Sequence, residues 1–302
     1  MKHFILTALF FCLTLNNSIL FAQNLHIQDP IDTLKVYQVE LSDGTIFMGF
    51  ILSKDTNTLV MKTNSIPRLE IPMAKVKSYK VLENATLKDD SYWFANPHAS
   101  RYLFGPSAIN LKKGEKYYQN TWLFLNSFNI GITDHFSMGG SIEMLTTLFN
   151  LATGSFSPTI MLTPKIGYQV ADKIHAGGGL LYANIIGEES AGIAYGIATA
   201  GSYDNNFSTG LGWGFINGSF SERPIITFSG MKRVSRKVAL VTENWLIPSN
   251  SLYSEYNYYG LFSYGMRFFS ENMAVDIAFI NNRDFADLFL IGVPFVSFTL
   301  KF

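Results

Sequence analysis

Apolar and polar side chains alternate along much of the chain after residue 96. In residues 158–170 the even positions carry Pro, Ile, Leu, Tyr and Val, while the odd positions carry Thr, Met, Lys, Gly and Gln. Residues 136–144 repeat the pattern, with Phe, Met and Ile on one face and Ser and Glu on the other. A period of two residues is that of a β-strand, whose successive side chains point to opposite faces. The alternation therefore predicts strands.

Each predicted strand has one face of small or polar residues and one of bulky apolar residues. In residues 207–215 Phe, Leu and Trp alternate with serine and glycine. In residues 192–202 glycine and alanine alternate with Ile193, Tyr195 and Ile197. A barrel in a membrane carries apolar residues outside and polar ones inside. We therefore expect the bulky apolar faces, that of 192–202 included, to point outward.

Two stretches lack a clear face. Asn120 and Asn126 share a face with Trp122 and Phe124, and the pair Glu243-Asn244 interrupts the apolar residues of 238–248. Bulges or strand ends are the expected reason.

Turn signals set the number of strands. Five tight polar turns are expected, at 133–135, 171–173, 204–206, 235–237 and 271–272. Six other connections alternate with them, near 113–116, 146–157, 187–191, 220–224, 249–256 and 283–290. Together they join twelve strands between Pro97 and Phe302, an even number that leaves both ends in the periplasm. Ten strands are the alternative.

Composition agrees with a membrane barrel. Apolar residues make up 48% and charged residues 15% of the 302 positions, against roughly 25% charged residues in soluble domains. After residue 22 there is no apolar run of about 20 residues, which a membrane-spanning helix needs. A closed barrel is the other way to pair every backbone group in lipid. Lys and Arg total 23, as do Asp and Glu, so no net field favours nucleic acid as a partner.

The first 22 residues resemble a secretory signal peptide. Lys2 and His3 precede an apolar stretch at 4–15, and cleavage is expected after Ala22. A retained membrane anchor is the alternative. The only cysteine, Cys12, lies in this segment, so the mature chain is expected to have no disulfide or thiolate chemistry.

Residues 23–84 are expected to form a small periplasmic β domain. Short strand-like runs occur at 36–41, 45–52, 59–63, 68–71 and 76–81, and Asp43-Gly44 is a hairpin signal. The run Leu41–Phe50, followed by Asp55, resembles the first half of an Sm-like motif and implies an SH3-like fold. RNA binding is not expected, because the domain lacks a basic stripe and a stacking surface. Residues 85–96 are the expected linker to the barrel.

Charged residues on the polar faces form a predicted lumen cluster. Glu143, Lys165, Arg267 and Asp276 lie on these faces, and the orientation of Glu243 and Arg233 is less clear. Opposite charges can pair and fill the interior, or they can line a narrow hydrated path. The sequence leaves both alternatives open.

The last strand has Val296, Phe298, Leu300 and Phe302 on one face. An alternating last strand with a terminal aromatic residue resembles the signal by which the barrel-assembly machinery recognises outer-membrane barrels. Phe298, Leu300 and Phe302 are therefore the expected assembly signal.

Candidate catalytic groups are few. His98 and Ser100 share a face but do not form the serine–histidine pair that an outer-membrane lipid hydrolase needs. Histidines do not occur at metal-ligand spacing, and Gly177–Gly179 lacks the lysine of a phosphate-binding loop. We expect no cofactor, no metal and no enzymatic activity.

Residues 97–102, 105–108 and 112–120 (PHASRY, GPSA and KKGEKYYQN) resemble the start of a group of uncharacterised Gram-negative outer-membrane β-barrel proteins. The resemblance implies an all-β fold and contact with outer-membrane lipid, but no established activity. The first functional hypothesis is a pore or transporter for small solutes. The second is a structural barrel with a filled lumen, whose N-terminal domain binds a periplasmic protein, and a lipid-modifying enzyme is a distant third.

Overall fold

The computed structural model describes residues 31–302, apart from residues 64, 83–85, 89–90, 153, 155–157, 186–188, 250–256 and 284–290. The predicted signal peptide with Cys12 lies outside the described residues, as do parts of four predicted loops. In the described part of the chain, no helix is long and apolar enough to span a membrane.

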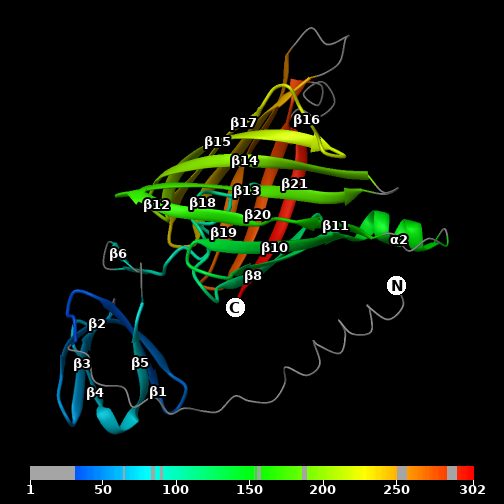
Figure 1. The fold of residues 1–302 in the computed structure, drawn as a ribbon. Coiled ribbons are helices and arrows are strands. Elements are labelled where there is room, and N and C mark those ends of the chain that lie inside the picture. Colours follow the sequence, from blue (N-terminus) through cyan, green and yellow to red (C-terminus); the bar gives the residue numbers. More distant parts are fainter. Residues whose placement is uncertain are drawn as a thin grey trace.

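An antiparallel five-stranded sheet, which we call the N-terminal module, comprises residues 31–82, with strand order β4-β3-β2-β1-β5 (Figure 1). Its elements are β1 (Val36–Leu41), β2 (Ile46–Lys54), β3 (Thr58–Lys62), β4 (Leu69–Pro72), the 3-10 helix η1 (Met73–Lys75) and β5 (Val76–Val81). Strands thus form at all five positions where the sequence predicts them. Val39, Ile51, Leu59 and Met61 pack into its core.

The first hairpin of the module turns at Asp43-Gly44. Gly44 has a φ of 86°, a conformation that glycine adopts without steric cost, and the Asp43 carboxylate accepts a 2.8 Å hydrogen bond from the Thr45 amide. The hairpin predicted at this dipeptide is confirmed.

The expected linker contains structure. Strands β6 (Thr86–Lys88) and β7 (Ser91–Trp93) pair as a short hairpin. The residues after it, Phe94 and Asn96, are buried inside the barrel. Residues 85–96 are therefore more than a simple connection.

The second sheet closes on itself as an antiparallel barrel, because β9 pairs with both β8 and β10. Its strands are β8 (Lys116–Thr121), β9 (Leu125–Gly131), β10 (Phe136–Glu143), β11 (Thr159–Leu162), β12 (Lys165–Ala171), β13 (Ile174–Ile185), β14 (Glu189–Gly201), β15 (Asn205–Ile216), β16 (Ser219–Phe220), β17 (Ile225–Ser235), β18 (Val238–Pro248), β19 (Tyr258–Phe269), β20 (Met273–Asn281) and β21 (Val293–Lys301). Strands β11 and β12 both pair with β10 and β13 and form one crossing, and the two-residue β16 only extends β15. In the described chain the wall therefore has twelve crossings, the predicted number.

The wall begins later than predicted, at Lys116 instead of near Pro97. Residues 112–115 form a turn at the end of the barrel that holds the C-terminus, where the Lys113 amide donates to Asp134 and the Phe302 amide donates to the Lys116 carbonyl. We call this the near end and the opposite one the far end. The connection near 113–116 is thus wrongly predicted to join two strands of the wall.

An unpredicted hairpin restores the count. Trp122 and Leu123 have φ values of 51° and 67° and reverse the chain between β8 and β9. Three residues, 122–124, connect the two strands, and two adjacent positive φ values in a hairpin usually belong to residues such as Asn and Gly, so this turn has no sequence signal. It also explains the misplaced asparagines, because Asn120 lies opposite Asn126 and donates a 2.9 Å hydrogen bond to it.

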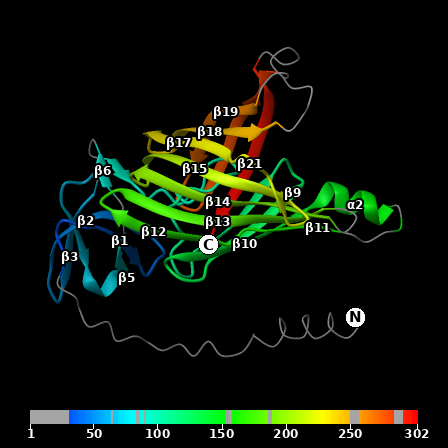
Figure 2. The same ribbon diagram turned by 45° about the horizontal axis from the view of Figure 1, so that its top comes forward.

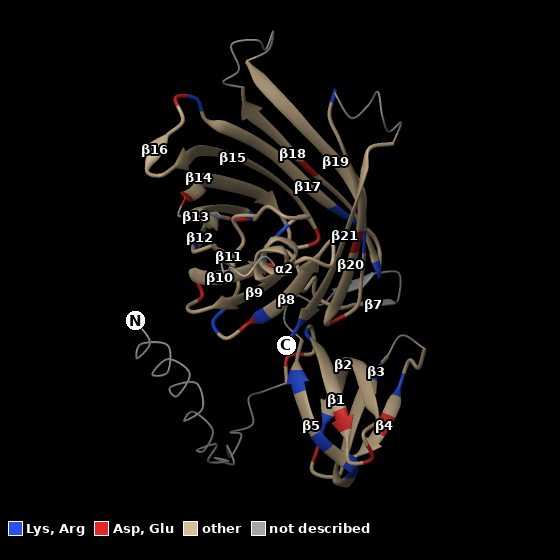
Figure 3. Ribbon diagram, turned by 90° about the vertical axis from the view of Figure 1, so that its right-hand side faces the viewer, with Lys and Arg blue, Asp and Glu red and all other residues tan. Residues whose placement is uncertain are grey.

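Most faces point as predicted. Ile166 and Tyr168 on β12, and Val296 and Phe302 at the C-terminus, are exposed on the outside of the barrel. On β18 Glu243 is buried inside, and Asn244 on the outer face bridges two neighbouring strands through the Phe228 carbonyl and the Ser263 amide. Figure 3 shows few charged residues along the barrel strands. An even number of antiparallel strands with an apolar outside is the architecture of outer-membrane barrels.

The prediction for residues 192–202 is wrong, because β14 has its bulky face inside. Thr199 on this strand is buried in the interior, which places Ile193, Tyr195 and Ile197 on the same inner face. Their neighbours on β15 are glycines, and Tyr195 lies opposite Gly212. Another part of the same chain fills the interior at this point, so large apolar side chains are favourable on the inner face of β14.

Helix α2 (Met144–Ala152) follows β10 at the far end and projects from the barrel (Figures 1 and 2). The sequence predicts only a loop in this region.

Candidate functional site in the barrel lumen

Residues 94–111 lie inside the barrel, between the short hairpin β6–β7 and the first wall strand. We call them the lumen segment. The segment folds back at Phe104 and Gly105, where the Tyr102 amide donates to the Gly105 carbonyl and the Ser107 amide donates to the Ser100 carbonyl. Most of its side chains are buried. The region predicted to start the wall therefore occupies the interior.

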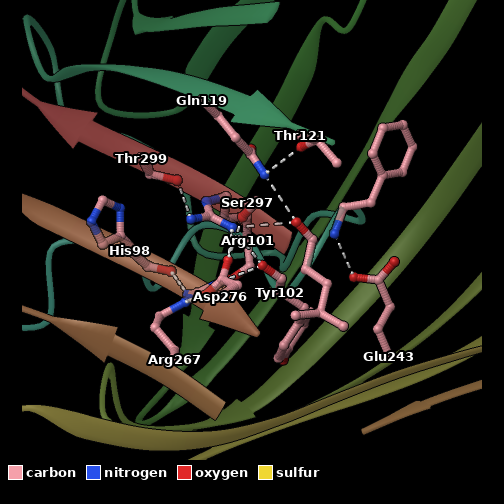
Figure 4. Close-up of polar contacts among 12 residues, drawn as sticks. His98, Arg101, Tyr102, Gln119, Thr121, Glu243, Arg267, Asp276, Ser297 and Thr299 are labelled. Atoms are coloured by element: carbon pink, nitrogen blue, oxygen red, sulfur yellow. Dashed lines mark hydrogen bonds and ion pairs between the residues drawn. The ribbon is translucent and has the colours of Figure 1, made fainter. Parts of the chain in front are cut away.

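A buried ion cluster fixes the tip of the segment to β19 and β20 (Figure 4). The Asp276 carboxylate accepts 2.6 Å from Arg267 Nε and 2.9 Å from Arg101 Nη1. Ser297 donates to the same carboxylate at 2.9 Å. Arg267 and Asp276 belong to the predicted lumen cluster, and the structure pairs them directly.

Arg267 also binds the backbone of the segment. Its guanidinium donates to the carbonyls of His98 and Tyr102. Arg101 Nη1 donates 2.8 Å to the carbonyl of its neighbour Tyr102, and its Nη2 donates 2.5 Å to Thr299. Both guanidinium groups thus donate to backbone carbonyls of the segment in addition to the Asp276 carboxylate. Without these donors the carbonyls would be buried inside the barrel with no hydrogen-bond partner.

Glu243 binds the turn of the segment. Its Oε2 accepts hydrogen bonds of 2.9 Å from the amides of Phe104 and Gly105. Trp245 Nε1 donates 2.9 Å to the other carboxylate oxygen. A Cβ at Gly105 would lie 3.2 Å from Glu243 Oε1, so a larger residue there would require the carboxylate to shift.

Lys165 binds the segment from the opposite wall. Its Nζ donates to the carbonyls of Ser100, Ser107 and Ile109 at 3.2, 3.0 and 2.8 Å. All three donor hydrogens of the ammonium group are used.

Arg233 holds the start of the segment at the near end. It donates 2.7 Å to the Phe94 carbonyl and 2.9 Å to Asp204. Its guanidinium also lies 4.7 Å from the centre of the Phe94 ring and 4.8 Å from that of Phe269.

Glu143 does not join this cluster. It lies at the far end, where its carboxylate accepts from the amides of Leu145 and Thr146 at the start of α2. Five of the six predicted lumen charges bind the lumen segment or its partners, and Glu143 caps a helix.

Arg101 is the residue that the sequence analysis misses. The signal available for it is an arginine within the family-like run of residues 97–102, in a stretch otherwise without charge. Because the sequence predicts that those residues belong to the wall, it predicts no partner for Asp276 among them.

One half of the lumen is tightly packed. Phe94, Tyr102 and Leu103 of the segment form an apolar cluster with wall residues of β17–β21. Those wall residues are Met231, Ala239, Val241, Phe269, Ala274, Ala278 and Phe295. Tyr102 also bonds to Asn206 and Ser208 through its hydroxyl.

The other half is looser and polar. A cavity of about 90 Å³ lies between the segment and strands β8–β14. Its polar wall carries hydroxyl and amide groups from Gln119, Thr121, Ser127, Asn129, Ser137, Ser141 and Thr163. A space of this size holds several water molecules.

A second cavity, of about 400 Å³, lies at the near end between the N-terminal module and the mouth of the barrel. Gln38 and Lys80 of the module line it together with Glu271 and Lys301 of the barrel. Val36 of the module packs in the same apolar cluster as Phe94, so the module contacts the segment at this end.

Ser100 and Leu111 line both cavities. The layer between the cavities is thus one residue thick in places. Beside it, Ser137 donates 2.9 Å to the side chain of Asn110, which joins the wall to the segment.

The predicted catalytic candidates lie in the lumen segment. His98 is buried, and its ring meets that of Tyr117 edge-on at 6.5 Å. Among the described residues, no group of three or more His, Asp or Glu side chains is arranged to hold a metal ion. The expectation of no enzymatic activity stays a prediction.

No protein-family model and no curated protein sequence matches the chain. Among solved structures, the NanC porin is similar with 8% identity and a TM-score of 0.40, covering 62% of this chain and 97% of its own. The KdgM porin is similar with 9% identity and a TM-score of 0.43, covering 62% and 96%. OmpT, an outer-membrane protein of Vibrio cholerae, has 10% identity and a TM-score of 0.33, covering 89% and 95%. None of these likenesses is close enough to carry an argument about function.

Proposed function

We propose that the chain is an exported outer-membrane barrel that admits small uncharged polar solutes along the β8–β14 side of its lumen. The observation that carries the proposal is the pair of cavities that share Ser100 and Leu111. The lumen segment closes this path only in the short layer between the two cavities. In this proposal, displacement of Leu111 joins the two cavities.

The chemistry of the path favours uncharged solutes. Lys165, Glu243 and Arg267 are each occupied by partners in the lumen segment or the wall. In the cavity beside β8–β14, the polar side chains other than Arg101 and Lys165 carry hydroxyl and amide groups, which hydrogen-bond a neutral solute.

Location in the outer membrane is part of the same proposal. The apolar outside of the barrel and the signal-like residues 1–22 support it. The N-terminal module would then be periplasmic, at the near end with the C-terminus. The SH3-like fold that the sequence predicts for the module stays a prediction.

The experiment is uptake of urea and glycerol by liposomes that contain the purified full chain. We expect slow uptake by the unaltered protein and faster uptake after Leu111→Ala, which removes bulk from the layer between the two cavities. Ser137→Phe places a ring in the path and should slow uptake. Met138→Phe is the matched control, since Met138 is the next residue on β10 and points outward.

A structural barrel with a filled lumen is the second candidate, favoured by the packed half and the buried ion cluster. Its expected result is that neither the unaltered protein nor Leu111→Ala takes up solute. In that case the N-terminal module, bound to a periplasmic protein, would carry the function.

A further inference from the structure

Helix α2 exposes a large apolar surface. Its nine residues include no charged side chain, and Leu145, Leu148, Phe149 and Leu151 are each more than half exposed, with Phe149 at 69%. Soluble surfaces rarely expose such a contiguous apolar patch without a binding partner.

The rotation of the helix about its axis is fixed by its polar side. Thr147 and Asn150 are buried, and Thr146 Oγ1 lies 3.2 Å from the hydroxyl of Thr159. Thr159 shares the lumen face of β11 with Met161, which lines the lumen cavity. The polar side of α2 therefore faces the inner side of the wall, and its apolar side faces away from the lumen.

Glu143 holds the helix at its start. Its carboxylate accepts 2.8 Å from the Leu145 amide and 2.7 Å from the Thr146 amide, two of the amides left unpaired at a helix N-terminus. A carboxylate at this end also favours the helix dipole. The helix is thus joined directly and firmly to the end of β10.

The apolar side of α2 continues the outer surface of the wall. Ile142, at the end of β10, and Ile160 and Leu162, on the neighbouring β11, are exposed on the outside of the barrel. The exposed residues of α2 follow Ile142 within a few positions. The apolar outer surface of the strands is therefore continuous with the apolar side of the helix. The one charged residue between them, Glu143, faces inward.

We propose that α2 lies in the membrane interface at the far end of the barrel, with its apolar side in the acyl chains of the adjoining leaflet. At 1.5 Å per residue the helix is about 14 Å long, which suits a helix lying in the interface and is far too short to cross the membrane. The partner of this surface is therefore lipid, and its role is to fix the depth of the barrel at that end. The assignment rests on the membrane location proposed above, and it does not depend on whether the lumen conducts.

Spin labels on single cysteines test the proposal in the full chain reconstituted in liposomes. Cys12 is the only native cysteine, so Cys12→Ala leaves a background in which Leu145→Cys, Leu148→Cys and Phe149→Cys each carry one label. Leu211→Cys is the lipid reference, because Leu211 points outward from the wall, and Thr45→Cys in the module turn is the water reference. The measurement is the collision rate of each label with oxygen, which is enriched in lipid, relative to a water-soluble nickel complex.

We expect the oxygen-to-nickel ratio at all three helix sites to be close to that at Leu211. A ratio close to that at Thr45 would overturn the proposal, because the helix would then lie in water. Dipolar broadening between labels at Phe149 would also overturn it, since a second copy of the chain would then cover the surface in place of lipid.

Discussion

Arg101 and Asp276, 175 positions apart in the sequence, form a 2.9 Å ion pair with side chains almost fully buried in the lumen. The pair joins the lumen segment to the wall, and Arg267 completes it from the adjacent strand. The Asp276 carboxylate thus pairs with two guanidinium groups, which also donate hydrogen bonds to backbone carbonyls of the segment.

Asp276→Asn should destabilise the barrel strongly, because it leaves two buried guanidinium groups without their anion. Removing one partner of a buried ion pair typically costs about 3–5 kcal/mol. Arg101→Met is the control and should cost less, since the Asp276–Arg267 pair remains. The measurement is the urea midpoint of unfolding, followed by the gel mobility of folded barrel. Equal losses in the two variants would contradict the shared-carboxylate arrangement.

Lys165→Met should loosen the lumen segment without unfolding the wall. The substitution keeps the volume of the side chain but removes the donor for three carbonyls of the segment. Hydrogen–deuterium exchange should increase in residues 97–111 and stay unchanged in the N-terminal module. Unchanged exchange in the segment would show that Lys165 does not hold it.

Gly179→Ala should destabilise the barrel by about 1–3 kcal/mol, the usual range for overpacking. A Cβ at this position would lie 2.5 Å from the Pro164 carbonyl and 2.6 Å from the Tyr195 hydroxyl. Gly196→Ala, on the outer face of β14, is the matched control, because its Cβ would meet no atom closer than 3.9 Å. Similar urea midpoints for both variants would contradict the inward orientation of Tyr195.

Leu123→Gly should stabilise the β8–β9 hairpin by up to about 1 kcal/mol. Leu123 is 81% exposed and has a φ of 67°, a conformation that is unfavourable for a residue with a Cβ. The adjacent Trp122 is left in place because its Nε1 donates to the Pro294 carbonyl. Leu125→Gly, inside β9, should instead lower the unfolding midpoint. A lower midpoint after Leu123→Gly would argue against the strained turn.

The pKa of Glu40 in the N-terminal module depends on its ion-pair partner, Lys77. A hydrogen bond from Lys77, 2.6 Å from Glu40 Oε1, lowers the pKa of the carboxyl, aided by the charge of the ammonium group. Because the pKa is lower in the folded state, the contact stabilises the module at pH values above the ordinary pKa of a glutamate carboxyl. This stabilisation is lost as the pH falls through the folded-state pKa. In a titration followed by NMR, Lys77→Met should return the Glu40 pKa towards its ordinary value, and an unchanged pKa would rule out this cause.

The sequence by itself determined the strands from β10 onward and most of the outer surface. The predicted count of twelve agrees with the structure because a wall strand wrongly expected before residue 113 offsets the unpredicted β8–β9 hairpin. A strand with one face in lipid must alternate, and tight turns between such strands use residues with strong local preferences, so both leave a pattern in the order of the amino acids. The outward faces of β12, β15 and the C-terminal residues followed from this rule. So did the strands of the N-terminal module, whose hairpin depends on Asp43-Gly44.

Only the tertiary structure decided what fills the barrel. Alternation has the same period whichever face is inside, so β14 was oriented by contact with the interior and not by its own pattern. The Trp122-Leu123 turn has no local signal, because contacts of Trp122 with the last strand support it from outside. The role of Arg101 depends on Asp276, a residue 175 positions away, and a pairing over that distance leaves no trace in local sequence.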